Sequence, residues 1–340
     1  MVPKVLQSTD AFAPVTIIET FDDLKNVLKA MLVTGIPELG GSLGWTEVFD
    51  DVDGWVIRDA NTGNTRDWIF RSFMDAAYHM VDVRGCDTAS SSTTGVNIFP
   101  AEAMRPVAST SHENSSPVIS LFNNSDTPDY KISSWAIVAT EKFVYLFTEC
   151  TSSYRGQYLN DTNGWCVTTW GHFKAHGANV ETAMVSGSGY SQYYSTLDYN
   201  LVMGTSETVA PRFIQRTPDA DPGDGALDFY VDADKVAIRK AGAAAISIAA
   251  NIDSRSGLPH LTSIDDPIIT SVMWIEHNNV ILGSLPGVKY INANALPPIG
   301  QGNISTLADG KNYMLVRAGG RSSANSGSAM LINLTDNWDA

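Results

Sequence analysis

Residues 20–85 read TFDDLKNVLKAMLVTGIPELGGSLGWTEVFDDVDGWVIRDANTGNTRDWIFRSFMDAAYHMVDVRG, and this stretch decides the fold class. Apolar residues recur at spacings of three and four between Thr20 and Thr34, which is the pattern of an amphipathic helix. Thr20 and Asp23 form a capping-box-like start, because a hydroxyl and a carboxylate can bind free amides of the first turn. Gly35 is expected to end the helix as a left-handed cap.

Short aromatic and β-branched segments follow the helix almost to the end of the chain, separated by turns rich in Gly, Asn and Asp. The predicted strands are 44–49, 55–58, 68–73, 79–84, 134–139, 143–147, 165–170, 212–214, 227–231, 236–239, 245–248, 268–275, 280–282, 313–317 and 329–334. The segments 87–95 and 109–116 are predicted to be surface loops. The sequence therefore predicts a mainly β fold, an antiparallel β-sandwich or meander with one N-terminal amphipathic helix.

The length of 340 residues allows two domains of ordinary size or one large β domain. A boundary is expected between Gly187 and Pro211, where Gly, Ser and Tyr replace the regular alternation. We therefore predict a helix-plus-β domain over 1–190. Residues 191–340 are a second β-rich region, which can also belong to the same domain.

A series of short motifs follows in a set order through the first half of the chain. These motifs are Lys4-Val5-Leu6, Ser8-Thr9-Asp10, Ala13-Pro14, Gly44-Trp45-Thr46, Arg58, Phe73, Val83-Arg84-Gly85, Phe99-Pro100, Ser134-Trp135, Phe143-Val144-Tyr145-Leu146-Phe147 and Trp170-Gly171-His172-Phe173. Their order over 1–175 resembles a family of tailed-bacteriophage virion structural proteins. Beyond residue 190 the likeness is limited to Leu285-Pro286-Gly287 and the strands near the C-terminus.

The resemblance implies a virion component encoded among tail genes, with no catalytic residues to carry over. We therefore expect a structural protein of the tail, neck or collar, or baseplate, which assembles with copies of itself and with neighbouring virion proteins. It would be made in the host cytoplasm and end in the virion.

The composition agrees with this expectation. Apolar residues make up 44% of the chain, but charged residues only 17%, below the usual share of about 25%. Such a surface is covered by Ser, Thr, Asn and Gly or by neighbouring subunits, and buried interface centres are depleted in charge. The formal net charge of -15 repels phosphate, so nucleic acid is not an expected partner.

The sequence predicts neither a membrane span nor a signal peptide. The longest apolar runs, such as 241–250, are far shorter than the ~20 residues that a spanning helix needs. The first residues contain no continuous apolar core of the kind that a signal peptide has. Cys86, Cys150 and Cys166 are too scattered for zinc ligands. Cys150 and Cys166 could meet on successive strands, although a reducing compartment favours buried free thiols.

Two segments resemble metal sites, and each has a simpler reading. His172 and His176 have the spacing of zinc ligands on a helix, but the sequence there predicts a strand, and Phe173 stands in place of the general base. The acidic run 219–234 resembles a calcium loop, but its glycine is one place late, and Tyr230 occupies the position of the bidentate Glu. A solvated acidic turn is the favoured reading, and an irregular calcium site stays open.

We assign no catalytic, cofactor-binding or metal-binding residue from the sequence. Ser188 lacks the strand-to-helix context of a nucleophile elbow, and the acidic residues are too many to nominate a hydrolytic pair. Five Asn residues begin glycosylation sequons, which we take as chance matches: Asn114, Asn123, Asn160, Asn303 and Asn333.

Two other functions remain as alternatives. A receptor- or glycan-binding module on the virion surface would use exposed aromatic residues, such as those in 190–199, to stack on host surface glycan. The favoured reading of these aromatics is that they are core or interface residues. A glycan hydrolase is the third possibility.

Overall fold

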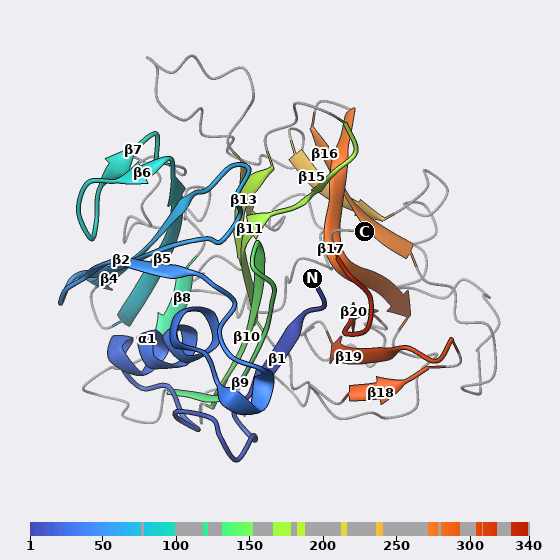
Figure 1. The fold of residues 1–340 in the computed structure, drawn as a ribbon, viewed down its shortest axis with the longest axis horizontal. Coiled ribbons are helices and arrows are strands. Elements are labelled where there is room, and N and C mark those ends of the chain that lie inside the picture. The colour runs from blue at the N-terminus through green and yellow to red at the C-terminus, as the bar shows by residue number, and fades with distance from the viewer. Residues whose placement is uncertain are drawn as a thin grey trace.

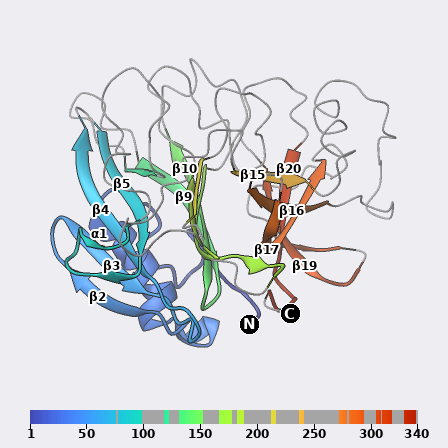
Figure 2. The same ribbon diagram turned by 90° about the horizontal axis from the view of Figure 1, so that it is seen from above.

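The computed structural model describes residues 1–75, 78–98, 118–121, 131–151, 166–177, 182–187, 212–215, 236–240, 271–277, 280–292, 304–307, 309–317 and 328–338. These residues form three larger antiparallel sheets that lie in successive layers, as Figures 1 and 2 show. One short helix, close to the N-terminus, packs between the first two layers. The prediction of a mainly β, antiparallel fold with an N-terminal helix is confirmed.

The order of strands in each sheet follows the chain closely in the first layer and less closely in the others. The first sheet contains, in order, β2 (Thr46–Asp50), β3 (Gly54–Arg58), β4 (Asp67–Asp75), β5 (Tyr78–Cys86) and β8 (Val118–Leu121). The middle sheet contains β1 (Lys4–Gln7), β9 (Lys131–Ala139), β10 (Phe143–Thr151), β11 (Cys166–His172), β13 (Ala183–Gly187) and β14 (Arg212–Gln215). The third sheet contains β15 (Val236–Lys240), β16 (Ser271–His277), β17 (Val280–Asn292), β20 (Ser328–Asn333), β19 (Asn312–Arg317) and β18 (Ile304–Thr306), with β12 (Lys174–Ala175) paired to β17.

The helix α1 (Phe21–Lys29) begins where the sequence predicts. Thr20 Oγ1 accepts a hydrogen bond from the Asp23 amide at 3.1 Å, and the Asp23 carboxylate accepts one from the Thr20 amide at 2.9 Å. This reciprocal pair is a complete capping box, which satisfies two amides that the first turn leaves free. The helix continues as a single wide π turn over Ala30–Thr34.

The end of the helix differs from the prediction. Gly35 has a positive φ of 83°, but its ψ of 153° is extended and not left-handed helical. The chain turns back here and places the Ser42 amide nitrogen only 2.1 Å from where a Cβ of Gly35 would lie. Pro37 then opens a 3-10 turn over Pro37–Leu39. Glycine is required at position 35 both for its φ and for this close approach.

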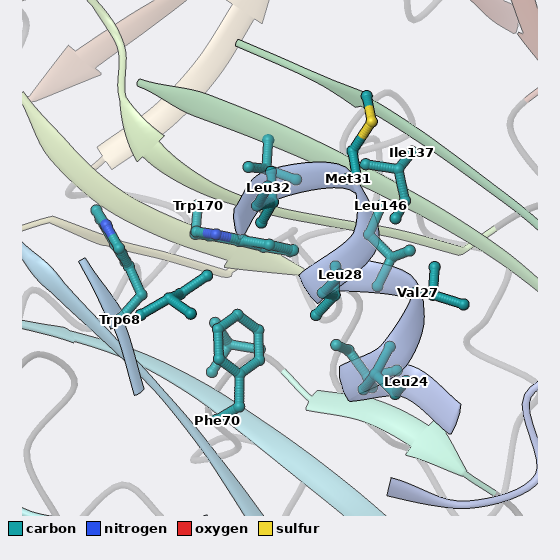
Figure 3. Close-up of a cluster of buried hydrophobic side chains, with 14 of the residues drawn as sticks. Leu24, Val27, Leu28, Met31, Leu32, Trp68, Phe70, Ile137, Leu146 and Trp170 are labelled. Carbon is teal, nitrogen blue, oxygen red and sulfur yellow. The ribbon is translucent and has the colours of Figure 1, made fainter. Parts of the chain in front are cut away.

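The main core lies between the helix and the two sheets that enclose it (Figure 3). The helix supplies the apolar stripe read from the sequence, namely Leu24, Val27, Leu28, Met31 and Leu32. The first sheet adds Trp68 and Phe70, and the middle sheet adds Ile137, Leu146 and Trp170. Phe70 packs edge-to-face against Trp170, with ring centroids 5.1 Å apart. The amphipathic stripe is therefore buried against two sheets at once, which explains why it is apolar over so wide an arc.

The five-stranded first sheet has two buried faces of different character. Its inner face, toward the helix, is apolar and consists of Trp55, Ile57, Trp68, Phe70, Val81 and Val83. Its outer face carries Val56, Arg58, Asp67, Ile69, Arg71, Asp82, Arg84 and Cys86, the residues that alternate with them. Because successive residues of a strand point to opposite faces, one run of sequence builds both surfaces.

The second face of the middle sheet packs against the third sheet. The Tyr145 hydroxyl donates to the Pro286 carbonyl at 2.9 Å, and its ring meets Trp338 edge-to-face at 5.6 Å. Trp338 in turn donates from its indole nitrogen to the Asn333 carbonyl at 2.8 Å. Gly287 has a φ of +66°, and a Cβ there would lie 2.1 Å from the Trp338 indole nitrogen. The Leu285-Pro286-Gly287 motif thus lies at the contact between two layers.

The structure also bears on two predictions about chain organisation. The segment 87–95, expected to be a loop, instead contains most of a two-stranded ribbon of β6 (Thr88–Ala89) and β7 (Gly95–Val96). The prediction is wrong at Thr88–Ala89 and Gly95, because Ala89 lies in a small apolar cluster on the outer face of the first sheet, whereas residues 90–94 form the connecting turn. Strand pairs β13–β14 and β12–β17 join residues on both sides of the division proposed at residue 190, and that division stays a prediction.

Candidate functional site

The most elaborate polar cluster among the described residues begins at Asp59, directly after β3. Its carboxylate accepts hydrogen bonds from the amides of Asn61 at 3.1 Å and Arg66 at 3.0 Å. It also accepts one from the indole nitrogen of Trp68 at 3.0 Å. The Asp/Asn/Gly composition that predicts a turn here therefore closes that turn around one buried carboxylate.

His172, at the end of β11, joins this carboxylate to the middle sheet. Its Nε2 lies 3.1 Å from Asp59 Oδ2, and its Nδ1 lies 2.8 Å from Thr182 Oγ1. The imidazole also meets the Trp68 ring edge-to-face at 6.2 Å. We call this arrangement the Asp59–His172–Thr182 chain.

The protons in the Asp59–His172–Thr182 chain follow from its chemistry. A carboxylate only accepts hydrogen bonds, so Nε2 of His172 donates to Asp59. In a neutral ring Nδ1 is then the acceptor, and the Thr182 hydroxyl donates to it. Carboxylate, imidazole and hydroxyl thus occur in the order used by hydrolytic triads, with the two ring nitrogens exchanged relative to the serine protease arrangement.

The surroundings of the Asp59–His172–Thr182 chain favour a structural role over catalysis. His172 is only 6% exposed and Asp59 only 3%, so substrate has no direct access to the imidazole. The His172 amide donates to the Lys142 carbonyl at 2.8 Å, and the Phe173 amide donates to the Thr182 carbonyl at 3.1 Å. Neither amide is therefore available as an oxyanion donor near Thr182. The Asp59–His172–Thr182 chain ties the turn after β3 to the end of β11 and to the residue before β13 in the middle sheet.

A second polar cluster covers the outer face of the first sheet. Asp67 pairs bidentately with Arg58, at 2.7 and 3.0 Å, and also accepts from the Ala89 amide at 2.7 Å. The hydrogen bonds that Arg58 donates to Asp67 raise the pKa of the guanidinium. The Asp67 contacts hold the β6–β7 ribbon to the sheet, because the Ala89 amide and the Arg58 guanidinium share one buried carboxylate.

Asp82 is the centre of the other half of this cluster. Its Oδ2 lies 2.8 Å from Arg71 Nη2 and 2.6 Å from Arg84 Nη2, and both Asp82 and Arg84 are buried. Sequence reasoning missed these partners. The available signal was opposite charge at alternate positions of adjacent predicted strands, since residues i and i+2 share a face.

The two histidines considered as zinc ligands are not brought together as a site. Both ring nitrogens of His172 are occupied by Asp59 and Thr182, and His176 is exposed just beyond β12. Groups of three or more His, Cys, Asp or Glu side chains able to hold a metal ion are absent from the described ranges.

Cys86 is a buried free thiol on the outer face of the first sheet, in contact with an apolar cluster that includes Val56 and Ile69. Burial raises its pKa from 9.0 to about 12, so the thiol stays protonated at neutral pH. Cys150 and Cys166 lie on the paired strands β10 and β11, where Cys166 is opposite Thr148. Their side chains are outside the described part of the structure.

Most of the remaining candidates also lie outside the described residues. These are the acidic run 219–234, Ser188, the aromatic stretch 190–199, and the sequons at Asn114, Asn123, Asn160 and Asn303. Asn333 is described and is buried. Its side-chain oxygen accepts from the Thr335 and Asp336 amides at 2.8 and 2.9 Å, so it is built into a turn and is not presented for modification.

Comparison with protein-family models, with curated proteins and with solved structures finds no match. Within the described residues, there is no helix long and apolar enough to cross a membrane. The functional conclusion therefore depends on the residues and geometry above and on the motif order of the first half.

Proposed function

We propose that this protein is a non-enzymatic structural component of a tailed-phage virion, in the tail, the neck or collar, or the baseplate. It acts by assembling with copies of itself and with neighbouring virion proteins, and it reaches the particle after synthesis in the host cytoplasm. The observation that carries the proposal is the ordered series of motifs over 1–175, which resembles virion structural proteins.

The places of the motif residues in the fold support this proposal. Trp45 donates from its indole nitrogen to the Thr140 carbonyl at 3.1 Å, which joins the chain after the helix to the β9–β10 turn. Trp135 and Trp170 are fully buried in the core, and His172 belongs to the Asp59–His172–Thr182 chain. The motif residues thus hold the layers of the fold together, as a structural protein requires.

The charge of the chain supports the same class of partner. With a formal net charge of -15, the protein repels nucleic acid but can meet other proteins through its uncharged surfaces. We therefore propose protein partners, including a second copy of this chain, and no nucleic-acid or membrane partner.

The glycan-binding alternative has less support. The tryptophans with described side chains are all buried, so none of them offers an exposed face to a sugar ring: Trp45, Trp55, Trp68, Trp135, Trp170 and Trp338. The stretch 190–199, on which that alternative depends, lies outside the described residues.

The direct test is to purify particles of the phage that encodes the chain and to identify the protein in them by mass spectrometry. Electron microscopy of the same particles then gives copy number and position. We expect the chain in stoichiometric amounts in the tail, neck or baseplate. A reducing-sugar assay of the recombinant protein on host surface polysaccharide should show no cleavage. Absence from the particle, or cleavage of host glycan, would contradict the proposal.

A further inference from the structure

A lysine amine, an asparagine amide and an aspartate carboxylate meet at one oxygen atom near the end of β20. Lys311 Nζ lies 2.5 Å from Asp336 Oδ2, and Asn333 Nδ2 donates a hydrogen bond to the same oxygen at 2.7 Å. Since both nitrogens are bonded to one atom, the amine lies beside the asparagine amide group. We call this arrangement the Lys311–Asp336–Asn333 cluster. It places a nucleophile, a base and an acyl carbon side by side.

The backbone holds Lys311 on the same face of the third sheet as Asn333. Tyr313 is opposite Asn333 in the β19–β20 pair, and Lys311 is two places before Tyr313. Alternation along the strand therefore puts the lysine diagonally across from the asparagine, a distance that a long side chain spans. The Lys311 amide donates to Asp309 Oδ1 at 3.0 Å, and its carbonyl accepts from the Leu307 amide at 3.0 Å. Held backbone on both sides lowers the entropic cost of their reaction.

The side-chain carbonyl of Asn333 is polarised in the way that an acyl group under attack requires. Its Oδ1 accepts hydrogen bonds from the amides of Thr335 at 2.8 Å and Asp336 at 2.9 Å. Two backbone donors at these distances form an oxyanion hole, because they stabilise the negative charge that develops on Oδ1 when a nucleophile adds to Cγ. Asn333 is only 4% exposed, so water has little access as a competing nucleophile.

The backbone nitrogen that follows Asn333 is not available to attack the same carbon. Its attack on Cγ would release ammonia and give a succinimide. The Leu334 amide instead donates to the Asn312 carbonyl at 2.9 Å, as part of the sheet. The Lys311 amine is therefore the nucleophile that the structure places at Asn333.

We propose that Lys311 and Asn333 join in an isopeptide bond, formed once within the folded chain with Asp336 as the proton carrier. The neutral amine adds to Cγ of Asn333 while Asp336 Oδ2 takes one proton from Nζ. The Nζ–Cγ bond forms, Asp336 gives that proton to Nδ2, the Cγ–Nδ2 bond breaks, and ammonia leaves. Lys311 and Asp336 are partly exposed, so ammonia has a path to solvent. Each chain modifies only itself, so the protein remains without an external substrate.

The protonation of Lys311 limits the rate of this step. The hydrogen bond to Asp336, together with the charges of Asp336 and Asp309, raises the pKa of the amine. The Tyr313 hydroxyl is the other titratable group here, and it donates to Asp309 Oδ2 at 2.8 Å. An ammonium has no lone pair to attack with, so the bond forms slowly at neutral pH and faster at alkaline pH.

The bond would join the β18–β19 turn to the turn after β20. That second turn leads to Trp338, whose ring packs on Tyr145 of the middle sheet. A cross-link restricts the unfolded chain, as a disulfide does, and so stabilises the folded one. The isopeptide would therefore secure the rim of the third sheet next to its contact with the middle layer.

The test is mass spectrometry of the full-length folded protein after prolonged incubation at alkaline pH. We expect digestion to yield a branched peptide that joins Lys311 to Asn333 and is lighter by one ammonia than its two parts. Lys311→Arg should abolish this peptide, and Asp336→Asn should slow its formation by about a hundredfold. Lys174→Arg, at an exposed lysine of β12, is the matched control and should react like the wild type. Circular dichroism should show the same fold for all four proteins.

Two results would overturn the proposal. One is the absence of the branched peptide from the incubated wild-type protein. The other is loss of ammonia at Asn333 without a link to Lys311, which marks a succinimide and would persist in Lys311→Arg. Formation in Asp336→Asn at the wild-type rate would contradict the role of Asp336 as the proton carrier. The recombinant chain is sufficient for these measurements, so their outcome is independent of whether the protein is found in virions.

Discussion

The two faces of the first sheet are built from the same strands but are stabilised in different ways. The inner face is apolar and packs on the helix, so its stability comes from removing aromatic and aliphatic surface from water. The outer face buries Asp67, Asp82 and Arg84, whose charges must be compensated by partners on the same strand or on a neighbouring strand. Two faces that are equally buried therefore depend on different interactions. Loss of packing leaves a cavity, whereas loss of one partner leaves an uncompensated charge.

Truncation of the inner face should have the largest effect. Phe70→Ala removes a buried ring whose centroid lies 5.4 Å from that of Trp55 and 5.1 Å from that of Trp170. We expect the free energy of unfolding to fall by about 3–5 kcal/mol, because the transfer free energy of the ring is lost and a cavity is left behind. Urea denaturation followed by fluorescence measures it. Phe70→Leu, as the control, should cost under about 1.5 kcal/mol. If both variants are equally stable, tight packing does not govern this face.

Removal of a charge from the outer face should cost nearly as much. Asp82→Asn withdraws the carboxylate that lies against both Arg71 and Arg84. We expect a loss of about 3 kcal/mol in the free energy of unfolding, because breaking a buried pair leaves charge behind.

A triple variant distinguishes compensation of charge from simple contact at Asp82. Arg71→Met, Asp82→Leu and Arg84→Met together remove every charge of this group and should recover most of the stability lost in Asp82→Asn. Urea denaturation of both proteins gives the comparison. A triple variant less stable than Asp82→Asn would mean that the ion pairs themselves stabilise the outer face.

The helix cap should matter less than the stripe that the helix buries. Thr20→Ala breaks the capping box with Asp23 and should lower the free energy of unfolding by about 1 kcal/mol. Thr20→Ser keeps the hydroxyl and should be near wild type. Thermal unfolding by circular dichroism measures both variants. A loss as large as that of Phe70→Ala would show that the helix depends on its cap more than on inner-face packing.

Chemical labelling of Cys86 tests whether the outer face is closed to solvent. Of these predictions it concerns the smallest effect on stability at neutral pH. Burial raises its pKa from 9.0 to about 12, so the thiolate fraction in the folded protein is about a thousandfold lower. In a Cys150→Ser, Cys166→Ser background, a thiol reagent at pH 8 should label Cys86 only upon unfolding. Rapid labelling of the folded protein would show that this face opens to solvent.

The raised pKa of Cys86 also predicts how the free energy of unfolding changes at high pH. Because the folded pKa of Cys86 lies above the unfolded value of 9.0, its contribution is complete below pH 9 and is lost as pH rises toward about 12. Cys86→Ala should therefore show a weaker decline in the free energy of unfolding over that range, measured by urea titration. An identical decline in both proteins would contradict burial of the thiol.

The sequence alone determined the local elements of this protein. Periods of 3.6 and 2 identify a helix stripe and alternating strands, and turn residues mark where the strands end, because these signals act between residues a few places apart. The helix start at Thr20 and the β2–β5 meander were predictable for this reason. The ribbon within 87–96 was missed, because its strands are only two residues long and depend on contact with the first sheet.

The tertiary structure decided the partners. His172 and Asp59 are 113 residues apart in the sequence, and no local pattern in either segment predicts their contact. A Cβ at Gly35 would lie 2.1 Å from the Ser42 amide nitrogen, and Arg71 meets Asp82 only when β4 and β5 pair. Periodicity specifies which residues share a face, but a buried charge or a close backbone approach is settled by residues brought together when the layers pack.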